Sequence, residues 1–375
     1  MTFPRIFIVW LLLIAVLVAR TSPSASEERM QKSLNEDPPA VDLATLKTLS
    51  AVVEKLTKKK IVYVGEEHDK FSHHQVQLAV LHAIYRQTPK IAVGMEMFQR
   101  PFQKALDDYI AGVIDERTFL KRSEYFKRWN IDYHLYKPIL DFAKDKGLPV
   151  IALNAPREIV DKVAKGGIES LSEEEKQTIP RDLDFSDEEY RARLKEVFGR
   201  HGESMEKKFE FFYQAQILWD ETMAESVDRF LKKHPGRRLV VLAGAGHLEY
   251  GSGIPKRSFR RNGFDYAIVL SDIGVKRDIA DFVVFPEEAK APAAPKLGID
   301  LDGHNQSVRI TGLAKDGAAE KAGLRVDDIL SSLDGCPVSS IDDVRIALFY
   351  KKRGETIKVK ARRGDNELEF DVSLQ

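Results

Sequence analysis

The hydrophobic pattern alternates short apolar runs with segments in which apolar residues recur every three or four positions, from about residue 38 to residue 285. Apolar runs without polar alternation are typical of strands that are buried on both faces, as in a parallel sheet covered by helices. Four such runs lie at 61–64, 91–94, 148–153 and 239–243. Two later runs, at 266–270 and 282–285, are weaker candidates for strands. This order predicts an α/β fold with a mostly parallel central sheet and flanking helices.

The segments on either side of the first run have helical spacing, at residues 41–56 and from residue 73 to about residue 86. Gly65 predicts that the backbone turns sharply out of the first strand. Ser72 is followed three residues later by Gln75, which predicts a capping box at the start of the next helix. The first strand, its turn and this helix therefore form one predicted unit.

A largely helical insertion is predicted within residues 116–234. Its charged part, 170–193, lacks an apolar face and predicts a solvated surface, with a lid as the weaker alternative. Residues 209–230 carry a broad apolar stripe that is typical of a core helix. Asp220 and Glu221 on that helix reach a site only if the helix covers it, and exposure is the simpler expectation.

The first 26 residues predict a secretory signal peptide. Arg5 precedes a continuous apolar run at 6–19, and small residues follow up to residue 26. The run is short for a membrane span, so an uncleaved anchor is the weaker alternative. No cysteine follows the run to accept a lipid. We therefore expect an exported bacterial protein in the periplasm.

Residues 286–295, rich in proline and alanine, predict a spacer between a first domain at 38–285 and a second at 296–375. Lys plus Arg equals Asp plus Glu, at 58 each, so no overall charge points to nucleic acid as a partner. Cys336 is the single cysteine, which excludes an internal disulfide. Packing must therefore stabilise each domain.

Polar residues follow four of the predicted strands, at the sheet edge where α/β proteins bind ligands. His68 and His247 each stand in a Gly-x-x-His context after a buried strand, which favours a shared site. His73 and His74 come at the start of the next predicted helix, where at least one is expected to cap the helix or face solvent. The strand-end residues are Glu66, Glu67, His68, Glu96, Asn154, Arg157 and His247.

Three kinds of chemistry remain open for this set. His68, Glu96 and His247 could hold a divalent metal such as zinc or manganese with a position left for water. Without a metal, a Glu and His pair such as Glu66 and His68 could act as a general base. The third kind is a haem site, in which a tyrosine or histidine ligates iron and arginines bind the propionates.

Seven segments resemble, in the same order, the ChaN family of haem-binding uptake proteins: VGEEHD, HHxxQ, VGMEMFQR, WNIDYHLYKPIL, ALNAPRE, ILWDETMA and VLAGAGHLEYGSGIP. The resemblance covers residues 48–284. It implies an α/β fold, haem binding linked to iron acquisition, and periplasmic or membrane-associated placement. Typical members look like lipoproteins, whereas this chain has no lipobox cysteine.

The family does not identify the haem ligand in this chain. Tyr133 and Tyr136 are the preferred candidates, with Arg157 for a propionate, because the tyrosines lie in a segment rich in aromatic and basic residues. The wider superfamily includes Tiki, TraB and erythromycin-esterase proteins. In some of these relatives, a set that maps onto His68, Glu96 and His247 serves metal-dependent or His/Glu hydrolysis.

Residues 296–375 resemble a PDZ domain of the bacterial protease type, most specifically at 319–324 and 334–338. Such a domain is β-rich and binds an extended peptide or a protein C-terminus as an added strand. The resemblance assigns a carboxylate-binding loop and a side-chain pocket to five residues: Leu297, Gly298 and Ile299 for the loop, and Val344 and Leu348 for the pocket.

Together these features predict an exported haem-binding protein linked to iron uptake, with a peptide-binding PDZ module. The alternative is a hydrolase that uses His68, Glu96 and His247, with the PDZ domain presenting substrate. A scaffold in which both domains only bind is the third interpretation. The sequence leaves a homodimer open.

Overall fold

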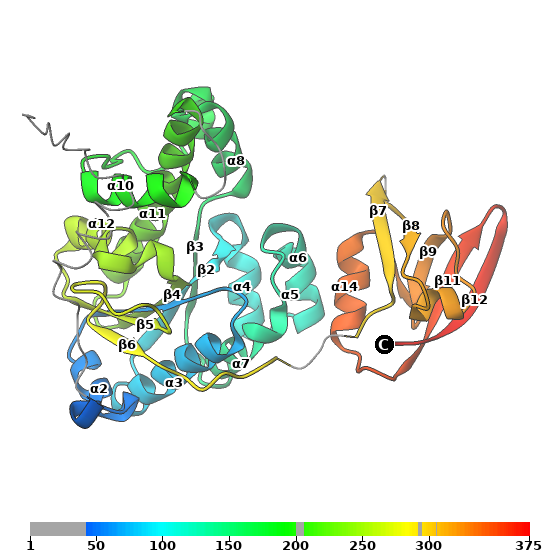
Figure 1. The fold of residues 1–375 in the computed structure, drawn as a ribbon, viewed down its shortest axis with the longest axis horizontal. Helices are drawn as coiled ribbons and strands as arrows, with labels where there is room; N and C mark the ends of the chain where they lie inside the picture. Colours follow the sequence, from blue (N-terminus) through cyan, green and yellow to red (C-terminus); the bar gives the residue numbers. More distant parts are fainter. Residues whose placement is uncertain (1–42, 200–205, 292–294, 305) are drawn as a thin grey trace, which may run out of the picture. The chain divides into compact units, whose positions relative to one another are not determined.

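The structure is a computed structural model that describes residues 43–199, 206–291, 295–304 and 306–375 (Figure 1). The predicted signal peptide lies outside these residues. Within the described part of the chain, no helix is long and apolar enough to cross a membrane.

The first domain is built on a six-stranded sheet in which every neighbouring pair is parallel. The strand order is β3-β2-β4-β1-β5-β6, so β1 lies inside the sheet between β4 and β5. This arrangement confirms the predicted α/β class. The strands are β1 (Ile61–Glu66), β2 (Ile91–Gln99), β3 (Val150–Asn154), β4 (Arg238–Gly244), β5 (Tyr266–Ser271) and β6 (Phe282–Val284).

Helices cover both faces of this sheet (Figure 1). One core contains α3 and α7 with side chains of β1 and β2 such as Val62 and Val93. The other contains α11 and α12 with the alternate side chains, such as Ile61 and Ala92. The helices are α2 (Leu49–Leu56), α3 (Phe71–Gln87), α4 (Gln103–Ile110), α5 (Glu116–Arg122), α6 (Tyr125–Arg128), α7 (Lys137–Asp145), α8 (Arg157–Gly166), α9 (Glu173–Lys176), α10 (Glu188–Gly199), α11 (Glu206–Lys233) and α12 (Ile254–Asn262).

Two local predictions around β1 were wrong. The strand continues through Gly65 to Glu66, and Gly65 is needed for packing, because a Cβ there would come within 2.4 Å of Leu270 Cδ2. The following helix begins at Phe71 with Lys70 as its N-cap, so Ser72 lies inside the helix and forms no capping box.

The insertion also departs from its prediction. The helix α11 forms as expected, but Asp220 and Glu221 are both fully buried. Arg257 and Arg261 of α12 contact the Glu221 carboxylate, at 3.3 and 2.5 Å, which compensates its buried charge. In the charged part of the insertion, Tyr190 is also buried. Two helices that the sequence assigns partly to solvent therefore pack against each other.

The second domain is an antiparallel sheet with two helices, in agreement with the predicted PDZ fold. Its strand order is β12-β11-β9-β8-β7, with β10 paired to β9, so β7 is an edge strand. The elements are β7 (Ile299–His304), β8 (Ser307–Leu313), α13 (Ala318–Lys321), β9 (Ile329–Leu333), β10 (Cys336–Pro337), α14 (Ile341–Phe349), β11 (Thr356–Arg363) and β12 (Asn366–Ser373). Domain boundaries at 285 and 296 remain a prediction, and no described residue between Val284 and Ile299 lies in a helix or strand.

Candidate functional site

The first side of the site is the pair Glu66 and His68 at the end of β1. The ring Nδ1 of His68 lies 2.5 Å from Glu66 Oε1. A carboxylate oxygen accepts, so Nδ1 donates and Nε2 is left as the second ring nitrogen. The Glu66 side chain is fully buried, whereas the His68 side chain is 37% exposed. His68 is therefore oriented by a buried carboxylate and remains accessible.

The second side is a chain of three charged residues from three different elements. His247 follows β4, and its Nδ1 lies 2.6 Å from Oδ1 of Asp220 on α11. Its Nε2 lies 3.4 Å from Oε1 of Glu96 on β2. Tyr190 donates its hydroxyl to the other oxygen of Asp220, at 2.8 Å. Both ring nitrogens of His247 are thus turned toward carboxylates.

This geometry sets opposite charges on Glu96 and His247. Burial alone would lower the pKa of His247, but the carboxylates of Glu96 and Asp220 outweigh burial and raise it to about 10. Burial alone would raise the pKa of Glu96, but the His247 imidazolium lowers it to about 2. Near neutral pH, His247 is therefore a cation between two anions.

The pKa of His68 is raised as well, for a different reason. Burial opposes the charged ring, and the hydrogen bond to Glu66 together with the charge of Glu96 favours it. His247 acts in the opposite direction because it repels a second cation. The two imidazoles therefore influence each other across one site.

The two sides meet at Gly244. A Cβ at this position would lie 2.9 Å from His68 Cε1 and 3.6 Å from Glu96 Oε2. The Gly244 amide donates to Glu96 Oε2 at 2.7 Å. Glycine is therefore required here by the close approach of the His68 ring, and the structure brings His68, Glu96 and His247 together. Their shared function stays a prediction.

Two tryptophans place their rings edge-to-face against the two histidines. The ring centroids of Trp129 and His68 are 4.8 Å apart with the planes at 78°. Those of Trp219 and His247 are 5.6 Å apart at 88°. Both tryptophans line the cavity that contains the histidines. The sequence did not single out either of them.

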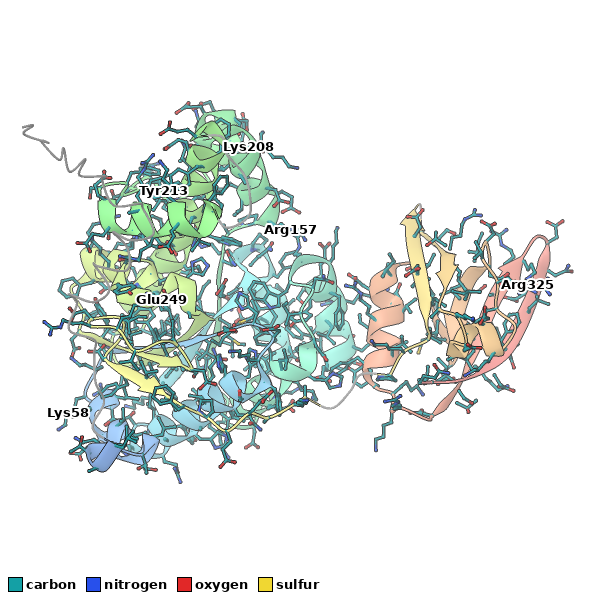
Figure 2. The ribbon with its side chains drawn as sticks, in the orientation of Figure 1. Lys58, Arg157, Lys208, Tyr213, Glu249 and Arg325 are labelled. Atoms are coloured by element: carbon teal, nitrogen blue, oxygen red, sulfur yellow. The ribbon has the colours of Figure 1, made fainter. Side chains whose placement is uncertain are left out.

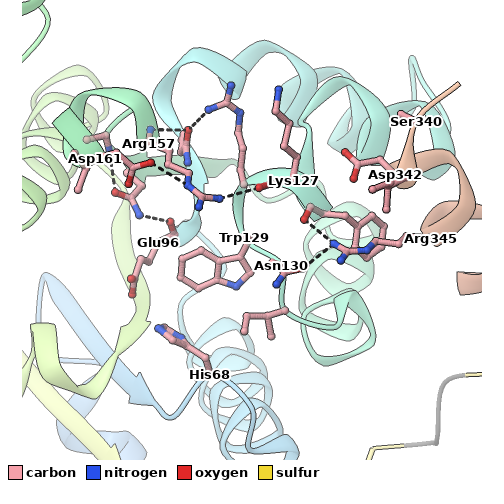
Figure 3. A pocket seen from close by; sticks show the side chains of 18 of the residues that line it. His68, Glu96, Lys127, Trp129, Asn130, Arg157, Asp161, Ser340, Asp342 and Arg345 are labelled. Carbon is pink, nitrogen blue, oxygen red and sulfur yellow. Dashed lines mark hydrogen bonds and ion pairs between the residues drawn. The ribbon is translucent and has the colours of Figure 1, made fainter. Parts of the chain in front are cut away.

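The cavity is lined by aromatic, basic, amide and acidic side chains, with Asp161 and Asn130 beside Trp129 and Arg157 (Figure 3). Arg157, at the start of α8, is about half exposed (Figure 2). It donates to the Lys127 carbonyl at 2.9 Å (Figure 3). Asn154 instead has a structural role, since it donates to the Glu96 carbonyl at 3.0 Å. Residues of the first domain that line the cavity include Phe126, Lys127, Arg128, Trp129, Ile131, Arg157, Val160 and Trp219.

The candidate tyrosine ligands are not among the residues that line this cavity. Tyr133 and Tyr136 are fully buried. Tyr136 accepts a hydrogen bond from Trp129 Nε1 at 3.1 Å and contacts the His74 ring. The assignment of either tyrosine to iron stays a prediction, and Tyr136 supports the cavity wall through its contact with Trp129.

His73 and His74 are buried as well, so of the expected roles, capping the helix or facing solvent, the second was wrong. His73 Nδ1 accepts from the Glu67 amide at 3.0 Å, and His74 Nε2 lies 3.1 Å from the His68 carbonyl. Both rings therefore hold the loop that carries His68.

The predicted divalent metal site is not supported by this geometry. Among the residues that the structure describes, no three His, Cys, Asp or Glu side chains are grouped so that they could hold a metal ion. His68 and His247 each use Nδ1 for a carboxylate, and His247 Nε2 is turned to Glu96 in an ion pair. The set is an acid–base network rather than a metal cage.

In the second domain, the residues assigned to peptide binding lie around β7 and α14. Gly298 has φ +72°, and a Cβ there would lie 3.3 Å from Ala314 Cβ, so the loop requires glycine. Leu297 and Val344 are buried in the domain core. Leu348 and Ile299 are partly buried against the same core. Their role in peptide binding remains a prediction.

Tyr190 is the site residue that sequence reasoning missed, and exposure was the simpler expectation for Asp220, which is buried in the site. Asp220 lies in the segment ILWDETMA, and a charged residue within an apolar helical stripe was the available signal. Its partner His247 is 27 positions away, so no local pattern joins them.

Two curated proteins are similar to parts of this chain. Protein RETICULATA-RELATED 5, chloroplastic, from Arabidopsis thaliana is 25% identical over 236 residues, which cover 58% of this chain and 32% of that protein. A probable CtpA-like serine protease from Staphylococcus haemolyticus is 32% identical over 78 residues, covering 20% of this chain and 16% of the protease. The chain thus spans about a third or less of either relative.

Among solved structures, the one described as cofacial heme binding to ChaN of Campylobacter jejuni has the same fold as the first domain. Its TM-score is 0.52 at 18% identity, covering 63% of this chain and 91% of the other. A PDZ domain model matches residues 295–374. The model described as haem-binding uptake, Tiki superfamily, ChaN matches residues 52–257, more than half of the 375 residues. The chain therefore belongs to the ChaN family of the Tiki superfamily and carries a C-terminal PDZ domain.

Proposed function

We propose that the first domain binds haem in the cavity that contains His68. The observation that carries this proposal is that an accessible, carboxylate-oriented imidazole lies in one cavity with two tryptophans and three basic side chains. Membership of a family described as haem-binding supports it. The ChaN structure of Campylobacter jejuni, described with cofacial heme, supports it as well.

The residues present fit the chemistry of the group. Trp129 and Trp219 offer flat aromatic surface for a porphyrin ring. Lys127, Arg128 and Arg157 offer cations for the propionates, and the guanidinium of an arginine suits a carboxylate best. Arg128 is paired with Glu158 and Arg157 with Asp161, so a propionate would compete with these carboxylates. The iron would supply ligation and redox chemistry once the group is bound.

His68 is the iron ligand that we propose. Its Nδ1 is held by Glu66, and such a hydrogen bond raises the basicity of the other nitrogen and fixes the ring. His247 is unsuitable because a ring held as an imidazolium has no lone pair to donate. The buried Tyr133 and Tyr136 would first have to leave the core.

A haemin titration of the full chain tests the proposal. Saturable growth and shift of the Soret band are expected, and iron-free protoporphyrin should bind more weakly because it lacks the ligand bond. A titration with no saturable change at micromolar haemin would refute haem binding by this chain.

Hydrolysis is a second candidate, supported by one observation. Glu66 and His68 form the carboxylate–imidazole pair that general bases use, and the Glu96 carboxylate lies on the other side of the same cavity. Screening ester and peptide substrates against the wild type and a His68→Ala variant separates this candidate. Activity that is equal in both proteins would exclude His68 as a base.

The second domain is proposed to bind protein C-termini or extended peptides along β7, as PDZ domains do. We also propose export through residues 1–26 and a role in iron uptake. Fractionation of a bacterial host that expresses the full chain, with sequencing of the mature N-terminus, tests export. Recovery of uncleaved chain in the cytoplasm would refute it.

A further inference from the structure

The edge strand β7 of the second domain has two chemically different faces. On one side β7 pairs with β8, and no other strand among the described residues pairs with its free edge. An added peptide strand would place its side chains alternately on the same two faces. The composition of each face therefore selects alternate peptide residues. This inference rests on the proposed peptide binding by the domain.

The inner face of β7 is apolar and lies against α14. Leu301 and Gly303 stand opposite Ile310 and Val308 of β8, both of which are buried in the core. A Cβ on Gly303 would lie 3.2 Å from Ile341 of α14. The last residue of a peptide and the third from its end would point to this face.

The outer face of β7 is acidic. Asp300 and Asp302 are exposed and stand opposite Gly312 and Arg309 of β8. Asp300 lies over Gly312, because a Cβ there would come within 2.4 Å of an Asp300 carboxylate oxygen. Glycine at 312 therefore leaves space above the strand for the acidic side chain.

Arg309 of β8, which stands opposite Asp302, also pairs with a third aspartate, Asp327. Arg309 donates to Asp327 Oδ1 at 3.2 Å, and both side chains are at least half exposed. Arg309 therefore also balances the charge of Asp327. Opposite charges on directly paired strand residues stabilise an antiparallel pair, and like charges destabilise it.

We propose that the second domain selects C-terminal peptides that have an apolar last residue and Lys or Arg at the second and fourth positions from the end. The apolar residue meets the face of β7 that packs against α14. The two cations lie next to Asp300 and Asp302. The edge strand β7 thus selects peptide side chains by charge on its outer face and by apolar contact on its inner face.

Fluorescence anisotropy with the full chain tests this selection. Two labelled hexapeptides end in valine and differ only at the second and fourth positions from the end, with Lys in one and Glu in the other. We expect the Lys peptide to bind about tenfold more tightly at low salt, and less so at high salt. The double variant Asp300→Asn, Asp302→Asn should reduce this ratio to about twofold or less.

Asp365→Asn is the matched control, because Asp365 is exposed in the turn between β11 and β12 of the same domain. It should leave the ratio unchanged. Equal binding of both peptides to the wild type, or a ratio that survives the double variant, would overturn the selection while peptide binding itself stands. No binding of either peptide would overturn both.

Discussion

His68 and His247 occupy the same Gly-x-x-His context, yet the structure gives them different chemistry. His68 has one carboxylate partner, Glu66, and a side chain that is 37% exposed. His247 has two partners, Glu96 and Asp220, and a side chain that is 10% exposed. The His68 ring lies at the cavity surface, where its Nε2 has no hydrogen-bond partner among the described residues, and the His247 ring is enclosed as a cation.

The difference arises from the elements that reach each ring. The partner of His68 is two residues away in the same strand end, so the pair is formed locally. His247 is reached from β2 by Glu96 and from α11 by Asp220. A local motif therefore places a histidine at the sheet edge, but distant elements decide whether it serves as a ligand or as a counter-ion.

The largest expected effect is on stability. His247→Ala leaves the buried Glu96 and Asp220 without their cation and should cost about 3–5 kcal/mol of unfolding free energy. His68→Ala should cost about 1 kcal/mol, because water reaches the vacated site. Urea unfolding followed by tryptophan fluorescence measures both, since residues 296–375 contain no tryptophan. Equal losses would remove the distinction between the two rings.

The next effect concerns haem affinity. His68→Ala should weaken haemin binding by about tenfold or more, since it removes the proposed iron ligand. His82→Ala is the control, because His82 is exposed on α3 and does not line the cavity. Tyr136→Phe should bind as the wild type does. If Tyr136→Phe lowers haemin affinity and His68→Ala does not, Tyr136 rather than His68 is the iron ligand.

A smaller effect is the pH dependence of stability. The pKa of His247 is raised from 6.5 to about 10, so its contribution is complete below pH 6.5 and is lost as pH rises toward 10. The pKa of Glu96 is lowered from 4.5 to about 2, so its contribution is complete above pH 4.5 and is lost as pH falls toward 2.

Stability should therefore be greatest between about pH 4.5 and 6.5. The variant His247→Gln should flatten the alkaline side of this curve, which thermal unfolding in a pH series measures. An alkaline decline of the same steepness in the variant would assign it to another group.

Much of this architecture could be predicted from the sequence because it rests on local patterns. The apolar run at 61–64 is the strand β1, and the strand ends bring His68 and His247 to one edge. The position of Glu96 was less predictable, because β2 continues to Gln99 and places the carboxylate inside a strand.

The residues that give the site its charge could not be found in the same way. Asp220 and Tyr190 enter through tertiary packing of α10 and α11, and their burial contradicts the polar character of their segments. Trp129 and Trp219 are ordinary apolar residues in sequence, and their role depends on the rings that they meet. Contacts with residues distant in the sequence, rather than local secondary-structure propensity, place these side chains in the site.

The protonation state of the two histidines tests the central claim most directly. Nitrogen-15 NMR of histidine-labelled protein, assigned with His68→Ala and His247→Gln, reports the charge on each ring through a pH titration. We expect His247 to keep both ring protons through pH 8.5 and His68 to titrate at lower pH. A neutral His247 at pH 7, or two rings that titrate together near pH 6.5, would contradict the division between counter-ion and ligand.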